Sequence, residues 1–386
     1  MIRKFWKYLI ILSKAKFSWR YPKKSSILIY DATGVYNFWK YVEKWDPQVL
    51  NVRGEKVNLK ILFSILFQPG SLFNAYVDKY IEHVNPNFII TFIDNSKFFY
   101  TLSNRHKSIK TIFIQNGFRC YYGDIFDTLD PLDRSELEIF KVDYMFTYGS
   151  GIGDHYLKYI SGLVIPVGSL INNSIERKVQ SQKDVMVYIS SFVPHDLSIN
   201  GELYNIEKFA GQMERPILKA LHSYADLHKK KFMIIPRTSK NSSNRILEKN
   251  YFNNLLHHKT NFIDLDEDFS SYDACDFAEV VIAIDTSLAY ESIARGNKTA
   301  VFSVRGNVFD LKGYGFGWPK NYPDRGSFWT NQLDLNAFNE ILDYLFKADK
   351  VTWEDDLSKI DFPLIMEYDR GNLNLQATLN KIIDLK

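Results

Sequence analysis

The chain has 386 residues, of which 46% are hydrophobic and 24% charged; two globular domains are expected, and a disordered chain, a collagen and a coiled coil are excluded. The 48 basic and 45 acidic residues leave a net charge of +3, too small for a general nucleic-acid binder. Two distant cysteines, Cys120 and Cys275, exclude a disulfide framework and favour a cytoplasmic location.

Residues 1–24 are predicted to be a basic amphipathic segment, because eight basic residues precede the first acid, Asp31. Its apolar residues would share one face of a helix: Ile2, Phe5, Trp6, Leu9 and Ile10. Such a helix either rests on an anionic membrane surface or packs on the domain. No apolar run is long enough to predict a spanning helix. We therefore expect a protein peripheral on the inner face of the cell membrane.

Residues 25–172 alternate between short apolar runs and helical stretches. The runs are 26–30, 88–93, 111–115, 144–148 and 163–167, each followed by polar residues or glycine. Apolar strands separated by helices indicate a parallel sheet covered on both faces. Ligands of such sheets bind at the carboxyl ends of the strands.

The alternation restarts after a polar linker, residues 173–183. A second domain is predicted over 184–365, with apolar runs at 185–189, 232–235, 261–263, 280–284 and 299–302. Residues 366–386 are expected to form a helix that packs back on the N-terminal domain. The predicted fold class is α/β, with two Rossmann-like doubly wound domains facing each other across a cleft.

The segment 285–296 reads as strand end, turn and helix. Asp285, Thr286 and Ser287 would lie at the helix N-terminus, where free backbone N–H groups and the helix dipole favour a phosphate. Glu291, one turn further, could accept ribose hydroxyls of a nucleotide. The alternative is a simple helix cap with Glu291 on the surface.

Three more residues at strand ends are expected to bind the same donor. Arg237 follows the run 232–235, and its guanidinium suits a phosphate or a carboxylate. Ser190 and Ser191 follow the run 185–189 and offer hydroxyls and amides. A surface arginine and a plain turn are the alternatives.

In the N-terminal half, Asp31 and Asp94 end apolar runs and are candidate bases for activating a hydroxyl. Arg119 is a third candidate catalytic residue, since its cation could meet an anionic ligand. The expected acceptor-binding residues follow the same strands: Asn95, Asn116 and Gly117. Caps and Asx-turns would explain the polar residues among them equally well.

No metal or cofactor is expected. The acidic run 264–268 contains Asp-x-Asp but is predicted to be a solvated loop. No P-loop, dinucleotide fingerprint, nucleophile elbow or zinc-peptidase motif occurs, which argues against an NTPase, a dehydrogenase, an esterase and a zinc peptidase. The glycine- and aromatic-rich stretches 313–319 and 326–329 would either stack on sugar rings or form a loop anchored by buried aromatics.

From about residue 25 to its end, the chain resembles the two-domain glycosyltransferase B (GT-B) architecture. Segments 92–95, 114–119, 168–173 and 285–296 resemble bacterial surface carbohydrate biosynthesis proteins. The last is also similar to the donor-site segment of capsule Kdo transferases and of CDP-glycerol glycerophosphotransferases. Those relatives commonly carry a His-Pro pair at the second strand of the donor domain, where this chain has Ile235-Pro236-Arg237.

The resemblance implies a C-terminal donor domain, an N-terminal acceptor domain and metal-independent transfer from a nucleotide sugar. A CMP-activated acidic sugar of the Kdo or nonulosonate kind is favoured, because Arg237 and Arg119 could hold a carboxylate as well as phosphate. The acceptor would be a surface polysaccharide or lipopolysaccharide, as a glycan or lipid-linked glycan. The alternatives are a polyol-phosphate transferase of the CDP-glycerol type and a non-catalytic sugar-binding assembly protein.

Overall fold

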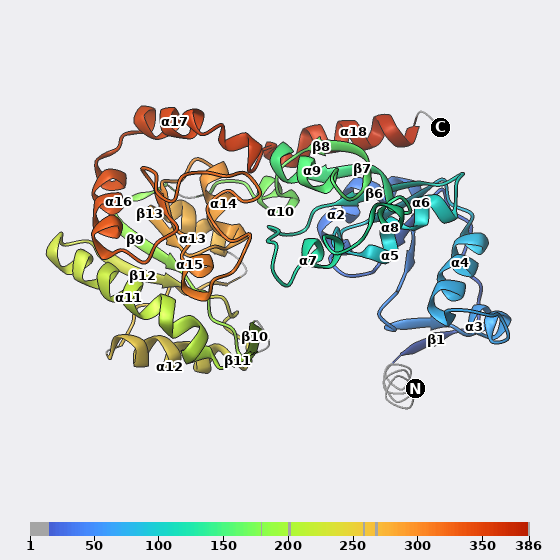
Figure 1. Ribbon diagram of the computed structural model, residues 1–386, viewed down its shortest axis with the longest axis horizontal. Helices are drawn as coiled ribbons and strands as arrows, with labels where there is room; N and C mark the ends of the chain where they lie inside the picture. Colours follow the sequence, from blue (N-terminus) through green and yellow to red (C-terminus); the bar gives the residue numbers. More distant parts are fainter. Residues whose placement is uncertain (1–14, 179, 200–201, 258, 267–268, 385–386) are drawn as a thin grey trace.

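The structure is a computed structural model that describes residues 15–178, 180–199, 202–257, 259–266 and 269–384. Two parallel sheets, each surrounded by helices, lie side by side along the longest axis of the molecule (Figure 1). The predicted α/β fold with two doubly wound domains is confirmed. The amphipathic helix predicted over residues 2–10 lies outside the described residues.

The N-terminal domain is built on a six-stranded parallel sheet with the strand order β3-β2-β5-β6-β7-β8. Its strands are β2 (Ile27–Tyr30), β3 (Gln48–Leu50), β5 (Phe88–Thr91), β6 (Lys110–Ile114), β7 (Lys141–Thr147) and β8 (Ser161–Pro166). The edge strand β3 was not predicted, because it has only three residues. Since the chain order reverses between β2 and β5, the carboxyl ends of these strands flank a topological switch point.

Side chains alternate between the two faces of this sheet. Ile27 and Ile29 of β2 pack with Phe38 and Leu379, whereas Leu28 points into the core on the other side. The first face is covered by α2 (Val35–Val42) and α18 (Leu373–Asp384). The remaining helices are α3 (Leu59–Ile65), α4 (Leu72–Val84), α5 (Lys97–Tyr100), α6 (Leu102–Arg105), α7 (Ile125–Leu129), α8 (Arg134–Leu137) and α9 (Ser150–Tyr156), with the 3-10 turn η1 (Glu43–Trp45).

A separate two-stranded parallel sheet stands at the outer end of this domain. It pairs β1 (Lys16–Ser18) with β4 (Lys56–Asn58), which leads directly into α3. The side chain of Asn58 caps α3 by accepting from the backbone N–H of Ile61.

The C-terminal domain holds a five-stranded parallel sheet in the order β12-β9-β13-β14-β15. Its strands are β9 (Gln182–Ile189), β12 (Lys231–Ile235), β13 (Ala278–Ala283), β14 (Thr299–Phe302) and β15 (Trp329–Thr330). The strand predicted over 261–263 is reduced to one bridge, between Phe262 and Ile234. The chain order reverses between β9 and β13, which creates a second switch point.

The helices of this domain pack around that sheet. They are α11 (Ile206–Leu227), α12 (Arg245–Leu256), α13 (Ser271–Phe277), α14 (Ser287–Ala294), α15 (Arg305–Phe309), α16 (Leu335–Lys347) and α17 (Lys350–Lys359). A short hairpin pairs β10 (Leu197–Ile199) with β11 (Glu202–Tyr204). In the described part of the chain, none of the helices is long and apolar enough to cross a membrane.

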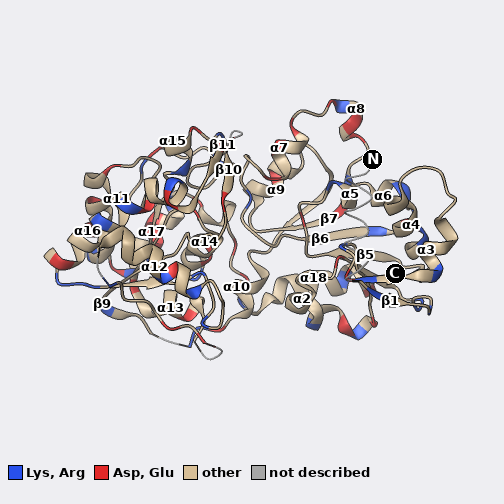
Figure 2. Ribbon diagram, turned by 90° about the horizontal axis from the view of Figure 1, so that it is seen from below, with Lys and Arg blue, Asp and Glu red and all other residues tan. Residues whose placement is uncertain are grey.

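Two crossings of the chain join the domains. The first is α10 (Leu170–Ser174), which lies between them in both ribbon views (Figures 1 and 2). The second runs through η2 (Phe362–Leu364) and η3 (Arg370–Asn372) into α18. Asn173 donates to the side-chain oxygen of Asn372 over 3.1 Å, and Asn372 donates to the Tyr41 hydroxyl over 2.8 Å. The two crossings are thus hydrogen-bonded to each other.

Candidate functional site

A pocket of about 430 Å³ lies at the carboxyl ends of β9, β12 and β13. This place is the switch point of the C-terminal sheet, where doubly wound folds bind ligands, and the volume suits a nucleotide-sized molecule. The lining residues are Ile189, Ser190, Ser191, Ile235, Pro236, Arg237, Ser271, Asp285, Thr286, Ser287, Leu288 and Arg305. All the predicted donor-binding residues except Glu291 are therefore gathered in one pocket.

Arg305 brings a second cation to the pocket besides Arg237. Its Nη2 lies 2.8 Å from Oδ1 of Asp285. Its Nε and Oδ2 of Asp285 are both buried and have no hydrogen-bond partner among the described residues. Burial raises the pKa of Asp285, and the Arg305 guanidinium opposes that rise. Arg305 is thus paired with Asp285 through one nitrogen and keeps a second N–H without a partner in the part of the chain that the structure describes.

Sequence reasoning missed Arg305, although a usable signal was present. The residue comes three positions after the apolar run 299–302, just as Arg237 comes two positions after the run 232–235. In a parallel sheet, both arginines therefore project from the same edge.

Glu248 of α12 holds the ends of β9 and β12 together beneath the pocket. Its carboxylate is fully buried and accepts from the Ser190 hydroxyl over 2.5 Å. It also accepts from the backbone N–H of Arg237 over 2.8 Å and that of Thr238 over 3.0 Å. Glu248 thereby positions two of the pocket residues. Nothing in its sequence context marks it, since it lies in the middle of a helix rich in polar residues.

Glu214 of α11 does the same for the neighbouring turn. It accepts from the Ser191 backbone N–H over 3.1 Å and from the hydroxyls of Tyr188 (2.7 Å) and Tyr251 (2.5 Å). Burial raises its pKa, although these three donors oppose the rise. The turn of Ser190 and Ser191 is therefore held from below by two buried carboxyl groups.

The N-terminus of α14 forms one wall of the pocket. Thr286 occupies the N-cap position without a side-chain capping bond. The first-turn N–H groups and the positive end of the helix dipole therefore lie beside the cavity, an arrangement that suits phosphate. The Ser287 hydroxyl accepts from the backbone N–H of Phe118 over 2.9 Å, and the Phe118 ring stacks on Tyr290 with centroids 4.2 Å apart. Through these contacts a loop of the N-terminal domain rests on the start of α14.

Glu291 lies at the joint between the domains instead of in the pocket. Its Oε1 accepts from the Ser169 hydroxyl over 2.5 Å and its Oε2 from the Tyr272 hydroxyl over 2.9 Å. Burial raises its pKa. The predicted contact with a ribose therefore has no support from this geometry, because both oxygens are occupied at the joint.

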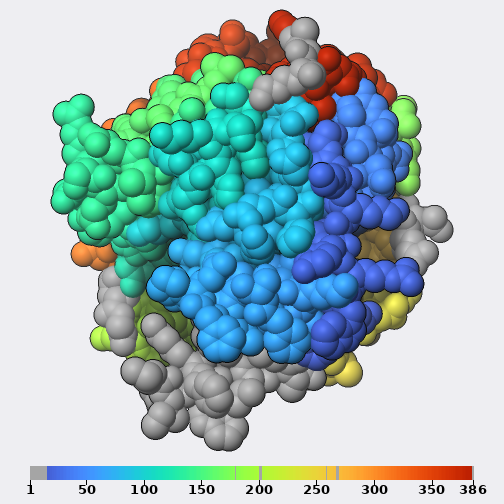
Figure 3. Space-filling model, turned by 90° about the vertical axis from the view of Figure 1, so that its right-hand side faces the viewer, coloured from blue at the N-terminus to red at the C-terminus, as the bar shows by residue number. Residues whose placement is uncertain are grey.

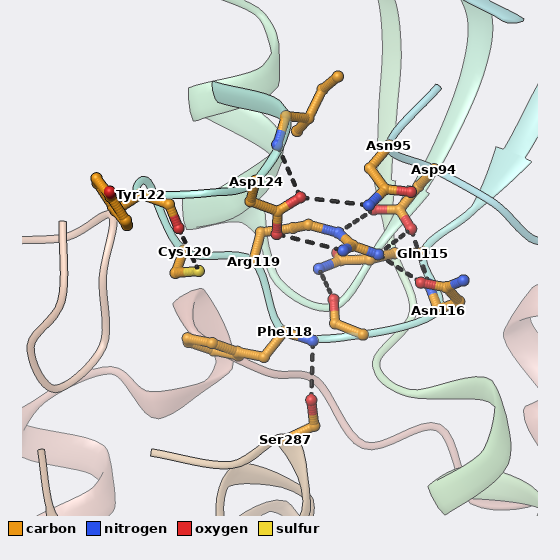
Figure 4. Close-up of polar contacts among 12 residues, drawn as sticks. Asp94, Asn95, Gln115, Asn116, Phe118, Arg119, Cys120, Tyr122, Asp124 and Ser287 are labelled. Carbon is orange, nitrogen blue, oxygen red and sulfur yellow. Dashed lines mark hydrogen bonds and ion pairs between the residues drawn. The ribbon is translucent and has the colours of Figure 1, made fainter. Parts of the chain in front are cut away.

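In the N-terminal domain, Asp94 and Arg119 form a buried two-pronged ion pair (Figure 4). Nε and Nη2 of Arg119 donate to the carboxylate over 2.8 and 2.6 Å. The Tyr156 hydroxyl (2.6 Å) and the Asn116 backbone N–H (3.1 Å) donate to it as well. A carboxylate with four such donors anchors its loop and is not presented as a general base. Arg119 is likewise occupied, which removes it as a free partner for a substrate carboxylate.

The three predicted acceptor-binding residues surround this pair. Asn95 donates to Oδ1 of Asp124 over 3.3 Å, and the side chain of Asn116 accepts from Arg119. The carbonyl of Gly117 accepts from the Gln115 side chain over 2.8 Å. The structure thus brings them together, each within the hydrogen-bond network of the loop that reaches α14 (Figure 4).

Asp31 lies apart from this network, at the end of β2 beside the switch point of the N-terminal sheet. Its Oδ2 pairs with Nε of Arg53 over 2.8 Å, and its Oδ1 accepts from the Thr33 backbone N–H over 2.9 Å. The latter contact is the Asx-turn that sequence analysis considered as the alternative.

The glycine- and aromatic-rich stretch does not offer a sugar-stacking surface, because Phe316, Phe328 and Trp329 are buried. Trp318 packs against Phe126 and His155 of the N-terminal domain, with ring centroids 5.5 and 4.8 Å away. The loop is thus anchored by buried aromatics and forms part of the domain interface.

Within the described ranges, the structure contains no cluster of three or more His, Cys, Asp or Glu residues that could hold a metal ion. Of the acidic run 264–268, the residues Glu267 and Asp268 fall outside those ranges. Metal-independent chemistry therefore stays a prediction.

Two doubly wound domains, with a cationic pocket at the switch point of the second, define a protein of GT-B type. Residues 112–383 match the family described as "putative O-antigen biosynthesis protein". The chain belongs to this family, and hence to the proteins of surface polysaccharide biosynthesis. No functionally curated protein is similar enough in sequence to be matched.

Solved structures agree on the fold. The chain is similar to UDP-GlcNAc 2-epimerase from Neisseria meningitidis bound to UDP-GlcNAc, with 13% identity, a TM-score of 0.53 and coverage of 92% of this chain and 99% of that one. It is also similar to the wall teichoic acid polymerase TagF, with 12% identity, a TM-score of 0.52 and coverage of 94% and 90%. At such identities the likeness concerns the fold alone.

Proposed function

We propose that the chain is a glycosyltransferase that binds a nucleotide sugar in the pocket at the switch point of the C-terminal sheet. The observation that carries this proposal is the convergence of Arg237, Arg305 and the N-terminus of α14 on one cavity. Two cations and a helix N-terminus suit the diphosphate or phosphate of a nucleotide. The fold shared with an epimerase bound to UDP-GlcNAc supports the same class of ligand.

The chemistry of the pocket fits transfer without a metal. When the bond between sugar and phosphate breaks, negative charge develops on the departing phosphate. Arg237, Arg305 and the N–H groups of α14 would stabilise that charge, and buried positions make such stabilisation strong. The acceptor, a surface glycan or a lipid-linked glycan, would approach from the side of the N-terminal domain.

The favoured donor remains a CMP-activated acidic sugar of the Kdo or nonulosonate kind. Such a donor carries one phosphate and one carboxylate, and two arginines line the pocket. Arg119 is paired with Asp94 and Asp124 and lies outside the pocket, whereas Arg305, although paired with Asp285, lines it; Arg305 therefore takes the place first given to Arg119. Activity should survive EDTA, and complete loss on chelation with rescue by magnesium or manganese would contradict the metal-independent reaction.

The direct test is calorimetric titration of the full chain with CMP, CDP, UDP and GDP. Arg305→Ala should weaken binding of the preferred nucleotide about 10- to 150-fold, as expected for the loss of a charge-assisted hydrogen bond worth about 1.5–3 kcal/mol. Arg325→Ala is the matched control, because Arg325 lies in the same domain but is exposed and paired with Glu340. Equal nucleotide affinities for the wild type and Arg305→Ala would show that the nucleotide does not bind in this pocket.

Turnover separates the remaining alternatives. Hydrolysis or transfer of a labelled CMP-sugar supports the glycosyltransferase, whereas turnover of CDP-glycerol alone indicates a polyol-phosphate transferase. Nucleotide-sugar binding without any turnover, in the presence of a surface glycan acceptor, would indicate a sugar-binding assembly protein.

A further inference from the structure

β1 and α3 lie at the outer end of the N-terminal domain, at the other end of the molecule from β9 and β12 (Figure 1), and they belong to an exposed aromatic and basic surface. It is formed by residues 15–24 and 56–72, which include β1, β4 and α3, and we call it the outer face. Its exposed apolar side chains are Phe17, Trp19, Tyr21, Phe63, Leu66, Phe67 and Leu72. Phe67 is 98% exposed and Trp19 59%. Soluble surfaces rarely gather so many large apolar side chains without a partner.

The aromatic side chains are arranged by the small sheet. Pairing of β1 with β4 brings Trp19 beside α3, where its ring stacks on Phe63 with centroids 5.9 Å apart. The loop after α3 then carries Phe67 outward. Figure 3 looks onto this end of the molecule, and these segments, in blue, form the lower part of its described surface.

The same two segments carry six cations and no acidic residue: Lys16, Arg20, Lys23, Lys24, Lys56 and Lys60. Among the described residues, none of the six forms an ion pair with an acidic side chain. Arg20, Lys23 and Lys56 also line a hollow of about 350 Å³, which has room for a phosphate-bearing head group. Unpaired cations around protruding aromatic rings match the composition of interfacial membrane contacts.

We infer that the outer face docks on an anionic lipid surface, with Phe63, Phe67 and Trp19 entering the head-group boundary and the lysines contacting lipid phosphates. A second copy of the chain would set the same cations against each other. Residues 1–14 contain Arg3, Lys4, Lys7 and Lys14 and no acid, so they cannot neutralise the charge of this surface either. An anionic bilayer satisfies both its charge and its apolar side chains. This inference does not depend on the nucleotide pocket.

The test is co-sedimentation of the full chain with vesicles of phosphatidylcholine, either alone or with one-third phosphatidylglycerol. We expect binding to the anionic vesicles only. Phe63→Ser/Phe67→Ser should weaken it about tenfold or more, and Lys56→Glu/Lys60→Glu roughly 25-fold or more, since each lysine near such a surface contributes about a factor of five. High salt should weaken binding of the wild type only in part, because the apolar contribution is not screened.

Val351→Ser/Leu373→Ser is the matched control, because these exposed apolar side chains lie on α17 and α18, at the opposite edge of the molecule (Figure 1). It should bind as the wild type does, and unchanged melting temperatures would show that all variants fold. The inference is overturned if the outer-face variants bind anionic vesicles like the wild type. It is also overturned if only Arg3→Glu/Lys4→Glu reduces binding, or if the outer-face variants instead abolish self-association of the chain.

Discussion

A single buried residue, Glu248, fixes the relative position of two strand ends that line the pocket. Ser190 and Arg237 belong to different strands, and it is the buried carboxylate of Glu248 that ties the two strand ends together through one hydroxyl and two backbone N–H groups. Buried donors left without such a partner are costly. The geometry of this side of the pocket therefore depends on a residue that does not itself line the pocket.

Glu291 gives a pH-dependent prediction. Burial raises its folded-state pKa above the usual 4.5, so its stabilising contribution is complete below that value and is lost as pH rises through the folded-state pKa. Glu291→Gln keeps the shape and removes the charge. The melting temperature of this variant, relative to the wild type, should therefore be more favourable at pH 8 than at pH 5.

Glu138→Gln serves as the control, because Glu138 is exposed on the surface. Its difference from the wild type should be the same at both pH values. A pH-independent difference for Glu291→Gln would mean that its carboxyl group is not destabilised by burial. Calorimetry of the same variant with the preferred nucleotide would show whether Glu291 also contacts the ribose.

At the scale of elements, apolar runs predicted the central strands of both sheets well, because strands buried on both faces read as continuous hydrophobic stretches. The run 299–302 matches β14, and the run 185–189 lies within β9, which begins three residues earlier at Gln182. Short edge strands escaped this signal: β15 has two residues and owes its place to pairing with β14. Tertiary contacts also decided that Phe316 is buried and that Glu291 lies at the joint between the domains. A local sequence pattern does not contain these contacts.

For the candidate site, the positions of the polar residues could be predicted from the sequence, but their pairing with one another could not. Polar residues after apolar runs were correctly expected at strand ends, since all strands of a parallel sheet point the same way. The sequence could not reveal which of these polar groups pair with one another inside the fold and so are not available to a ligand. Asp94 and Arg119 are separated by 24 residues and looked like two independent ligands, yet they neutralise each other inside the fold.

Gly168 gives a prediction about the joint between β8 and α10. Its φ of +75° favours glycine, and an added Cβ would lie 2.1 Å from the carbonyl oxygen of Glu367 in the second crossing. Gly168→Ala should therefore lower the free energy of unfolding by about 2 kcal/mol or more. Urea denaturation followed by circular dichroism measures this change.

Gly211→Ala is the matched control in the middle of α11, where the nearest side-chain atom to an added Cβ is 3.9 Å away. There, alanine should raise stability by about 0.5–1 kcal/mol, because glycine is a poor helix former. Equal effects of the two substitutions would contradict the close approach of the two crossings.

At the scale of the whole molecule, α18 joins the last residues of the chain to the first domain. Leu379 is fully buried against Ile27, Ile29 and their neighbours. Leu379→Ala should cost about 2–5 kcal/mol, the usual range for a cavity in a core. Leu373→Ala, on the exposed side of the same helix, should cost little. Limited proteolysis should then release fragments from the N-terminal domain of the first variant only.

The path of α18 also sets an order of events during synthesis. A domain made first on the ribosome can usually complete its folding while the next one is still being translated. Here α2 covers one part of a face of the first sheet early, but the part that α18 covers stays exposed until that helix has been made. The N-terminal domain is therefore completed only after the C-terminal domain has been made, and a chain that terminates before α18 leaves part of an apolar sheet face exposed to chaperones and proteases.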